Sequence, residues 1–330
     1  ALLLEAVGRP VVCTSGNLSE EPMCVETEEA LARLGRVADL VLTHDRPIAR
    51  PVDDSVARMD PDGLRMLRRA RGVAPRTVPL PGGGPVILAA GAHLKSAVAL
   101  GLPVGAGEAV LSQHLGDLDT AAAREAYERA VRDLLAFHGA RPGLVACDLH
   151  PDYASTRAAE RWAAEWRVPL VRVQHHHAHV AAAMAEFGLD GPVLGFAWDG
   201  TGYGTDGAVW GGEALIVEGA GFRRAAHLRS FALPGGDRAV MEPRRAALGA
   251  LYDIAPDDAR AAAAGWFPPA TLETLLAMLA RGVRSPRTTS VGRLFDVVAA
   301  LAGLRTRAGY EGQAAMAVEC AAETASRDAG

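Results

Sequence analysis

The segment that decides the fold reads Arg172-Val-Gln-His-His-His-Ala-His-Val-Ala-Ala-Ala-Met-Ala-Glu186. It holds four of the ten histidines in a 330-residue chain, and the Ala-rich run after them predicts a helix that begins near the cluster. Side chains at positions i and i+4 of a helix share a face, so His175 and His179 could bind one metal ion from the same side. A single histidine would more simply be a core residue, but four within five positions favour a metal site. Imidazole suits Zn, Fe, Cu and Ni, so the segment does not select the metal.

Length and composition are those of a large globular protein with room for two or three domains. The hydrophobic content is 49% and the mean hydropathy is +0.09. No apolar run reaches the roughly 18 residues of a membrane span and no signal peptide is visible, so we expect a cytoplasmic protein without membrane contact. The net charge of −5 gives no support to nucleic-acid binding. The four cysteines form no Cys-x-x-Cys pair, as expected of reduced thiols.

Both ends of the sequence suggest a piece of a longer protein. The chain begins at Ala1 rather than Met, inside an apolar segment of helical character. It stops at Gly330, shortly after the predicted helix 313–326.

Residues 1–78 form the first predicted domain. The apolar stretches 10–13 and 38–44 predict buried strands, and residues 27–34 predict a helix with an acidic first turn. Residues 79–85, Pro-Leu-Pro-Gly-Gly-Gly-Pro, predict a linker. Four arginines near the end of this domain could form a solvated face or bind phosphate: Arg58, Arg68, Arg69 and Arg71.

Strands and helices alternate from Val86 onward. The predicted strands are 86–91, 109–114, 143–148 and 169–174, and the predicted helices are 120–138, capped by Asp117 or Asp119, and 155–165. A new strand begins near Pro192, and the chain is mainly helical beyond Pro243. This pattern predicts an α/β fold with two lobes, about 86–190 and 191–330, and a ligand cleft between them.

One lysine stands among the 34 basic residues, Lys95, just after the first of these strands. Lysine and arginine differ in charge geometry and hydration, so the exception indicates a role for this side chain. A chance leftover is the alternative.

A second motif, Asp199-Gly-Thr-Gly-Tyr-Gly-Thr-Asp-Gly207, follows an apolar strand, where α/β folds place ligand-binding groups. Its glycines would let backbone amides approach a phosphate, and Asp199 could complete a His/His/Asp metal site. A glycine-rich hairpin without a ligand is the alternative. Weaker candidates lie in turns before predicted helices: Gly235, Gly236, Gly292 and Glu311. The turn that contains Ser15 and Asn17 is generic when taken alone.

Several of these motifs together resemble the hydrogenase maturation carbamoyltransferase family HypF. In the second part of the chain they are Val173-Gln-His-His-His-Ala-His179, Asp199-Gly-Thr-Gly-Tyr-Gly204, Trp210-Gly-Gly-Glu213 and Tyr310-Glu-Gly-Gln-Ala-Ala-Met316. In the first part they are Thr14-Ser-Gly-Asn-Leu-Ser-Glu-Glu-Pro22, His44-Asp-Arg-Pro-Ile48 and Asp53-Asp-Ser-Val-Ala-Arg58. The resemblance implies a partial YrdC-like α/β domain followed by a TsaD-like domain of the actin/hexokinase-type ATPase fold.

The resemblance also implies an activity. In that family carbamoyl phosphate is hydrolysed, and the carbamate is activated with ATP as carbamoyl-adenylate. The carbamoyl group then passes to the C-terminal cysteine of the partner HypE, on the way to the cyanide ligands of [NiFe]-hydrogenase. Mg would accompany the nucleotide.

By resemblance, Ser15 and Asn17 would belong to the adenylate-forming pocket, with Lys95 as a further candidate there or at the nucleotide. His175, His179 and Asp199 would bind a divalent metal, Fe or Zn. The nucleotide would be contacted by Thr201, Gly202, Tyr203, Gly235, Gly236, Gly292 and Glu311.

The departures from the family pattern concern whole segments. We expect this chain to lack the acylphosphatase domain, the Cys-rich zinc segment, the first half of the YrdC-like domain and the end of the TsaD-like domain. In the family, that end carries a further metal-binding aspartate. The piece alone should therefore not hydrolyse carbamoyl phosphate, and its adenylation and metal sites should be incomplete.

Three other readings stay open. An O-carbamoyltransferase would use the same two domains with a small-molecule hydroxyl as acceptor. A zincin-type metallohydrolase would need glutamate after the first histidine, where this chain has His176. A metal- and nucleotide-binding scaffold without catalysis is the third.

Overall fold

The computed structural model describes residues 2–18, 21–61, 63–80, 82–105 and 107–328. The chain divides into two compact units, Ala1–Arg172 and Val173–Gly330, and each is described by itself. Two motif residues (19 and 20) and residue 81 of the predicted linker lie outside the described ranges.

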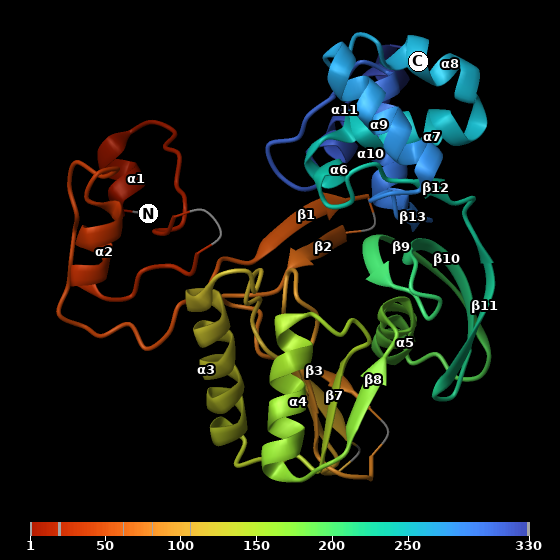
Figure 1. Cartoon of the computed structure of the whole chain (residues 1–330). Helices are drawn as coiled ribbons and strands as arrows, with labels where there is room; N and C mark the ends of the chain where they lie inside the picture. The colour runs from red at the N-terminus through yellow and green to blue at the C-terminus, as the bar shows by residue number, and fades with distance from the viewer. Residues whose placement is uncertain (1, 19–20, 62, 81, 106, 329–330) are drawn as a thin grey trace. The chain divides into compact units, whose positions relative to one another are not determined.

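The first fifty residues carry two short helices, α1 (Leu2–Val7) and α2 (Thr27–Leu34), joined by irregular segments (Figure 1). The helix predicted at 27–34 is confirmed. The strands predicted at 10–13 and 38–44 are wrong, because both stretches are irregular and exposed. A strand needs a neighbour to pair its backbone N–H and C=O groups, and neither stretch has one in the described part of the chain.

A six-stranded sheet is the centre of the first unit. Its strand order is β3-β6-β5-β4-β7-β8, and β4 and β7 run parallel. The strands are β3 (Arg76–Pro79), β4 (Ile87–Ala89), β5 (Ala99–Leu102), β6 (Glu108–Leu111), β7 (Leu144–Asp148) and β8 (Leu170–Val173). Before them β1 (Val56–Asp60) and β2 (Gly63–Arg68) form an antiparallel hairpin.

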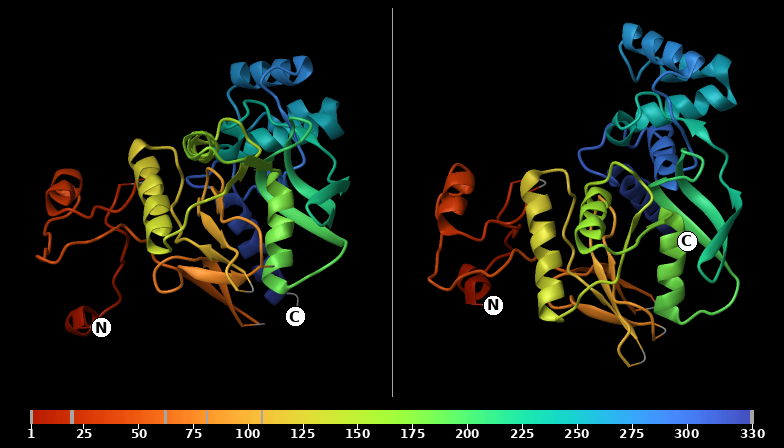
Figure 2. Two further views of the ribbon diagram at one scale, coloured as in Figure 1. Left: turned by 90° about the horizontal axis from the view of Figure 1, so that it is seen from below. Right: turned by 60° about the horizontal axis from the view of Figure 1, so that its bottom comes forward.

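Two helices, α3 (Ala121–Phe137) and α4 (Ala154–Trp166), cover one face of this sheet (Figure 1, Figure 2). The predicted cap of the first helix is wrong, since the side chain of Thr120 accepts the hydrogen bond from Ala123 N at 3.1 Å. Asp117 instead accepts a hydrogen bond from Lys95 N, at 2.6 Å. Asp117 therefore stabilises the loop that contains Lys95, and Thr120, directly before the helix, caps α3.

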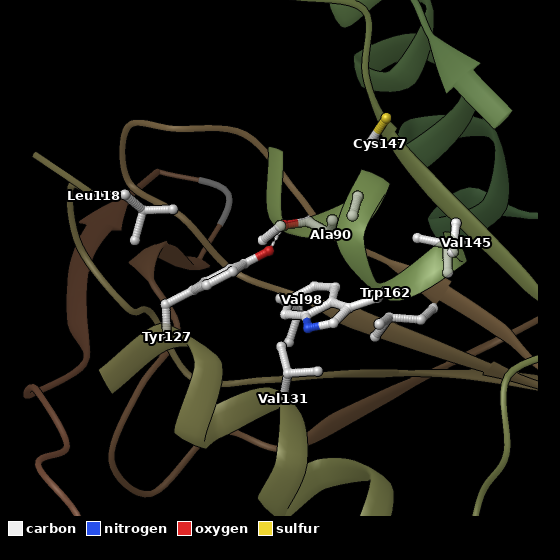
Figure 3. Close-up of a cluster of buried hydrophobic side chains, with 12 residues drawn as sticks. Ala90, Val98, Leu118, Tyr127, Val131, Val145, Cys147 and Trp162 are labelled. Atoms are coloured by element: carbon white, nitrogen blue, oxygen red, sulfur yellow. Dashed lines mark hydrogen bonds between the residues drawn. The ribbon is translucent and has the colours of Figure 1, made fainter. Parts of the chain in front are cut away.

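The core between these helices and the sheet is built on Tyr127 of α3 and Trp162 of α4, whose rings stack at 5.8 Å (Figure 3). Tyr127 is fully buried, and its hydroxyl donates to Ala90 O at 2.7 Å. Leu88 and Val145 supply the strand side of the core. The hydrogen bond from Tyr127 thereby joins α3 to the sheet at Ala90, the residue that follows β4.

The second unit starts with α5 (His175–Phe187), which packs on an antiparallel meander of three long strands. These are β9 (Val193–Tyr203), β10 (Val209–Glu218) and β11 (Gly221–His227). The short strands β12 (Phe231–Ala232) and β13 (Arg287–Thr288) continue the sheet beside β10.

Helices make up the remainder of the second unit, as predicted beyond Pro243. They are α6 (Arg238–Met241), α7 (Pro243–Ile254), α8 (Pro256–Ala263), α9 (Pro269–Arg281), α10 (Val291–Leu301) and α11 (Gln313–Asp328). Buried alanines on α7 and α10 let these two helices pack closely against Phe231 and Leu233. None of the described helices is long and apolar enough to span a membrane.

The buried hydroxyl of Tyr127 gives a test of this core. Tyr127→Phe leaves Ala90 O without its donor, so we expect a loss of about 1–2 kcal/mol of unfolding free energy. Thermal unfolding of the full-length parent protein should then show a lower midpoint, by about 2–4 °C per kcal/mol. Phe137→Ala is the control, because Phe137 is 80% exposed. An equal midpoint shift in both variants would contradict the assigned role.

Candidate functional site

Gln174 fixes the start of the histidine helix. Its side-chain oxygen accepts from His177 N at 2.9 Å, which caps α5. Its amide nitrogen donates to Tyr203 O at 3.1 Å and approaches His176 Nδ1 at the same distance. The helix begins at His175, in agreement with the predicted start near the cluster, and is joined to the end of β9 by one buried side chain.

Three side chains converge where α5 meets β9. The Nε2 atoms of His175 and His179 are 3.2 Å apart. Asp199 Oδ2 lies 3.0 Å from His175 Nε2 and 3.6 Å from His179 Nε2. These residues are the one group in the described ranges whose nitrogen and carboxylate atoms are arranged to share a metal ion.

The donor set fits a divalent transition metal. Tetrahedral ligands about 2.0–2.2 Å from an ion are roughly 3.3–3.5 Å from one another, close to the observed separations. Asp199 Oδ2 is buried and makes no hydrogen bond of good geometry, although two imidazole nitrogens are near it. A buried carboxylate oxygen beside two imidazole nitrogens suits a shared ion. Two histidines and a carboxylate occur as ligands of both Zn and Fe(II).

The electrostatics of this site favour an ionised Asp199 and a neutral His176, as binding of a cation requires. Burial would raise the pKa of Asp199, but the imidazoles of His175 and His179 and the Gly200 N–H outweigh it and hold that pKa below its usual range. His176 is fully buried, and desolvation together with His175 lowers its pKa to about 4. His176 is therefore neutral and supports the site, while His177 packs on Phe222 at 4.9 Å.

The first part of the glycine-rich motif lies inside a strand rather than after it, which corrects the prediction. β9 continues through Asp199 to Tyr203, and the turn follows at 204–208. A Cβ on Gly202 would lie 2.4 Å from His176 Cε1, so glycine is needed for α5 to approach the strand. Thr201 is exposed and Tyr203 half-buried at the strand end, where both can meet a ligand.

Two of the weaker candidates lie beside Asp199. A Cβ on Gly292 would be 2.9 Å from the Cα of Gly200, at the start of α10. Glu311 Oε1 lies 3.8 Å from where a Cβ of Gly200 would be. Gly235 and Gly236 form a turn after β12, and a Cβ on Gly235 would lie 2.8 Å from the buried Arg245 guanidinium. Gly292 and Glu311 are thus the better placed pair.

The first unit contains a separate cavity of about 350 Å³ that Ser15, Asn17 and Lys95 line together. Nothing local in the sequence joins Lys95 to Ser15 and Asn17, because Lys95 follows them by about 80 positions. Lys95 has a left-handed backbone (φ 48°), and its N–H is held by the Asp117 carboxylate. Sequence reasoning missed several charged residues of this wall: Arg50, Asp53, His114, Arg129 and Asp133. Burial and the neighbouring Arg68 lower the pKa of His114, so mainly arginines and Lys95 carry the positive charge here.

Removal of one imidazole tests the metal site. Loss of a residue that only hydrogen-bonds to a metal ligand weakens metal binding by about 10–100-fold. We expect His175→Ala, which removes a ligand itself, to weaken Zn²⁺ binding by the full-length parent protein by more than that. Isothermal titration calorimetry measures the affinity. His177→Ala is the control, since its ring packs on Phe222. Equal affinity in wild type and His175→Ala would show that the three side chains do not share an ion.

A model described as "HypF Kae1-like domain" matches residues 83–186, and "Carbamoyltransferase, Kae1-like Domain, second subdomain" matches residues 195–330. The model of the Sua5/YciO/YrdC family, described as "Telomere recombination", matches residues 1–70. The mixed α/β fold with YrdC-like and Kae1-like parts is thereby confirmed.

Relatives and solved structures agree. Carbamoyltransferase HypF2 of Cupriavidus necator is 45% identical over 98% of this chain and 41% of its own length. Carbamoyltransferase HypF of Rhodobacter capsulatus is 45% identical over 96% of this chain and 43% of its own length. A crystal structure of full-length HypF "in the phosphate- and nucleotide-bound form" is 39% identical and covers 93% of this chain and 47% of its own, with a TM-score of 0.84. HypF of T. kodakarensis is 35% identical over 93% of this chain and 41% of its own, also with a TM-score of 0.84.

The chain spans less than half the length of these relatives. Within that span the similarity runs from the YrdC-like part through both Kae1-like subdomains, and it includes the histidine segment and the Asp199 strand. The two HypF models together match well over half of the residues. The chain therefore belongs to the HypF carbamoyltransferase family.

Proposed function

We propose that the protein containing this chain transfers a carbamoyl group during [NiFe]-hydrogenase maturation. Carbamoyl phosphate and ATP would give carbamoyl-adenylate, and the carbamoyl group would pass to the C-terminal cysteine of a HypE-like acceptor protein. The observation that carries the proposal is the His175–His179–Asp199 constellation in a chain of the HypF family. The domains would be 1–78, YrdC-like, a linker at 79–85, and 86–330, TsaD-like.

Adenylate formation is assigned to the cavity of the first unit. Ser15 and Asn17 offer hydrogen-bonding groups at one wall, and Lys95, Arg50, Arg68 and Arg129 supply positive charge at the others. Such charge would hold the phosphates of ATP and Mg and stabilise the negative charge that develops when pyrophosphate leaves. A carbamoyl-adenylate hydrolyses readily, so formation of the intermediate within this cavity would limit its contact with bulk water.

Carbamoyl transfer is assigned to the second unit. A bound Fe or Zn ion would polarise the carbamoyl oxygen and help to hold the phosphate. His175, His179 and Asp199 would hold that ion, and the strand end at Thr201, Gly202 and Tyr203 would contact the nucleotide. The partner's thiolate would attack the carbamoyl carbon while the C–O bond to AMP breaks. The nucleophile would come from the partner, so the chain's own cysteines are not needed.

Transfer of label tests this function directly. With ATP, the full-length parent should move label from carbamoyl phosphate to an acceptor protein that ends in cysteine, and His175→Ala should abolish the transfer. The matched control is His177→Ala, which should keep it. Label on small hydroxyl compounds alone would identify an O-carbamoyltransferase. Label on no acceptor would refute carbamoyl transfer and leave a binding scaffold.

Lys95→Ala tests the cavity separately. Loss of a preorganised positive group facing the reacting phosphates should lower carbamoyl-phosphate-dependent ATP–pyrophosphate exchange by about 10²–10³-fold. Arg141→Ala removes the same charge from an exposed surface position and should leave exchange unchanged. Unchanged exchange in Lys95→Ala would remove Lys95 from the adenylation site, whatever happens to carbamoyl transfer.

A further inference from the structure

A buried carboxylate in the middle of β10 lies outside the metal constellation. Glu213 is 1% exposed and accepts four hydrogen bonds. Oε1 receives Gly211 N at 3.0 Å, Gly212 N at 3.2 Å and the Thr289 hydroxyl. Oε2 receives Arg224 Nε at 2.6 Å. Burial of a carboxylate is unfavourable unless hydrogen bonds compensate for the lost water. The partners of Glu213 therefore indicate which segments this side chain holds in place.

The bond to Thr289 leads directly to the metal constellation. The next residue, Ser290, is fully buried, and its hydroxyl donates to Gly200 O at 2.7 Å and lies 3.2 Å from Asp199 O. A Cβ on Gly211 would lie 2.6 Å from Asp199 O and 2.8 Å from Ser290 Cα. The backbones of Asp199, Gly211 and Ser290 are therefore in contact, and Glu213 binds two of the segments that meet there.

At its other oxygen, Oε2, the negative charge of Glu213 is balanced by the guanidinium of Arg224. Arg224 lies over the Trp210 ring at 3.9 Å and within 3.4 Å of Asp206 Oδ2. Asp206 in turn accepts from Trp210 Nε1 at 2.8 Å. Burial would raise the pKa of Glu213, but Arg224, Thr289 and Gly211 N outweigh it and lower that pKa, so the carboxylate is ionised. Asp206 is thus at the end of this network that is away from Thr289.

We propose that Glu213 is a positioning residue for the metal site: through Thr289 and Ser290 it holds the Asp199 backbone so that Oδ2 faces His175 and His179. This rests on the proposed function for the identity of the site and adds a residue that sets its geometry. Neither the i,i+4 spacing of the histidines nor the glycine-rich motif points to Glu213.

Cobalt binding separates positioning from general support. Co²⁺ is the probe, because its visible absorption reports ligand geometry. We expect Glu213→Gln in the full-length parent to bind Co²⁺ at least about tenfold more weakly than wild type, with an altered spectrum. Asp206→Asn is the matched control, since it removes one charge from the same network but not the bond to Thr289. It should keep the wild-type affinity and spectrum even if its melting temperature falls.

A second pair of variants keeps the test open if Glu213→Gln does not fold. Thr289→Val removes only the hydroxyl and should weaken Co²⁺ binding in the same sense, and Thr289→Ser should restore it. Wild-type affinity and spectrum in Thr289→Val would overturn the inference, as would equal weakening in Asp206→Asn. Wild-type protein that binds no Co²⁺ would refute the metal site itself and the inference with it.

Discussion

Close contact between backbones is the constraint on which the second unit depends. Asp199 in β9, Gly211 in β10 and Ser290 before α10 meet at distances that leave no room for a Cβ on Gly211. The same holds where Gly292 meets Gly200. The missing Cβ atoms allow this approach, and Ser290 and Glu213 pair polar groups at the contact. Asp199 is therefore carried by a strand that contacts two neighbouring backbones, and side chains on strands are placed more precisely than side chains on loops.

The two units use different physics for their sites. In the second unit, two imidazoles and a carboxylate converge, and the positive partner they suit is an ion. In the first unit, arginines and Lys95 line an open cavity together with Asp53 and Asp133, which suits an anion accompanied by its own cation. A nucleotide with Mg would suit the cavity of the first unit. A metal ion that binds a phosphate or carbonyl oxygen would suit the histidine and aspartate site of the second unit.

Local patterns in the sequence predicted what depends on local structure. The shared face of His175 and His179, the helices around Tyr127 and Trp162 and the helical region beyond Pro243 follow from helical periodicity, whereas the predicted cap at Asp117 or Asp119 was wrong. The strand predictions for 10–13 and 38–44 failed because an apolar stretch does not by itself supply a neighbouring strand. The cavity joining Ser15 to Lys95, and the link from Glu213 to Asp199, depend on contacts between residues far apart in sequence. Trp210-Gly-Gly-Glu213 was recognised as a motif, but only the structure shows what its glutamate binds.

The solitary lysine has a practical consequence for the chemistry of this cavity. Every other basic side chain in the sequence is an arginine, whose guanidinium does not react with acylating reagents under conditions that modify amines. Lys95 is therefore the one side-chain amine of the chain, and it lies in the wall of the cavity. Lys95 is exposed at this wall, so an amine-selective label on its side chain reports on the cavity, and a bound ligand can be followed through its protection of this one residue.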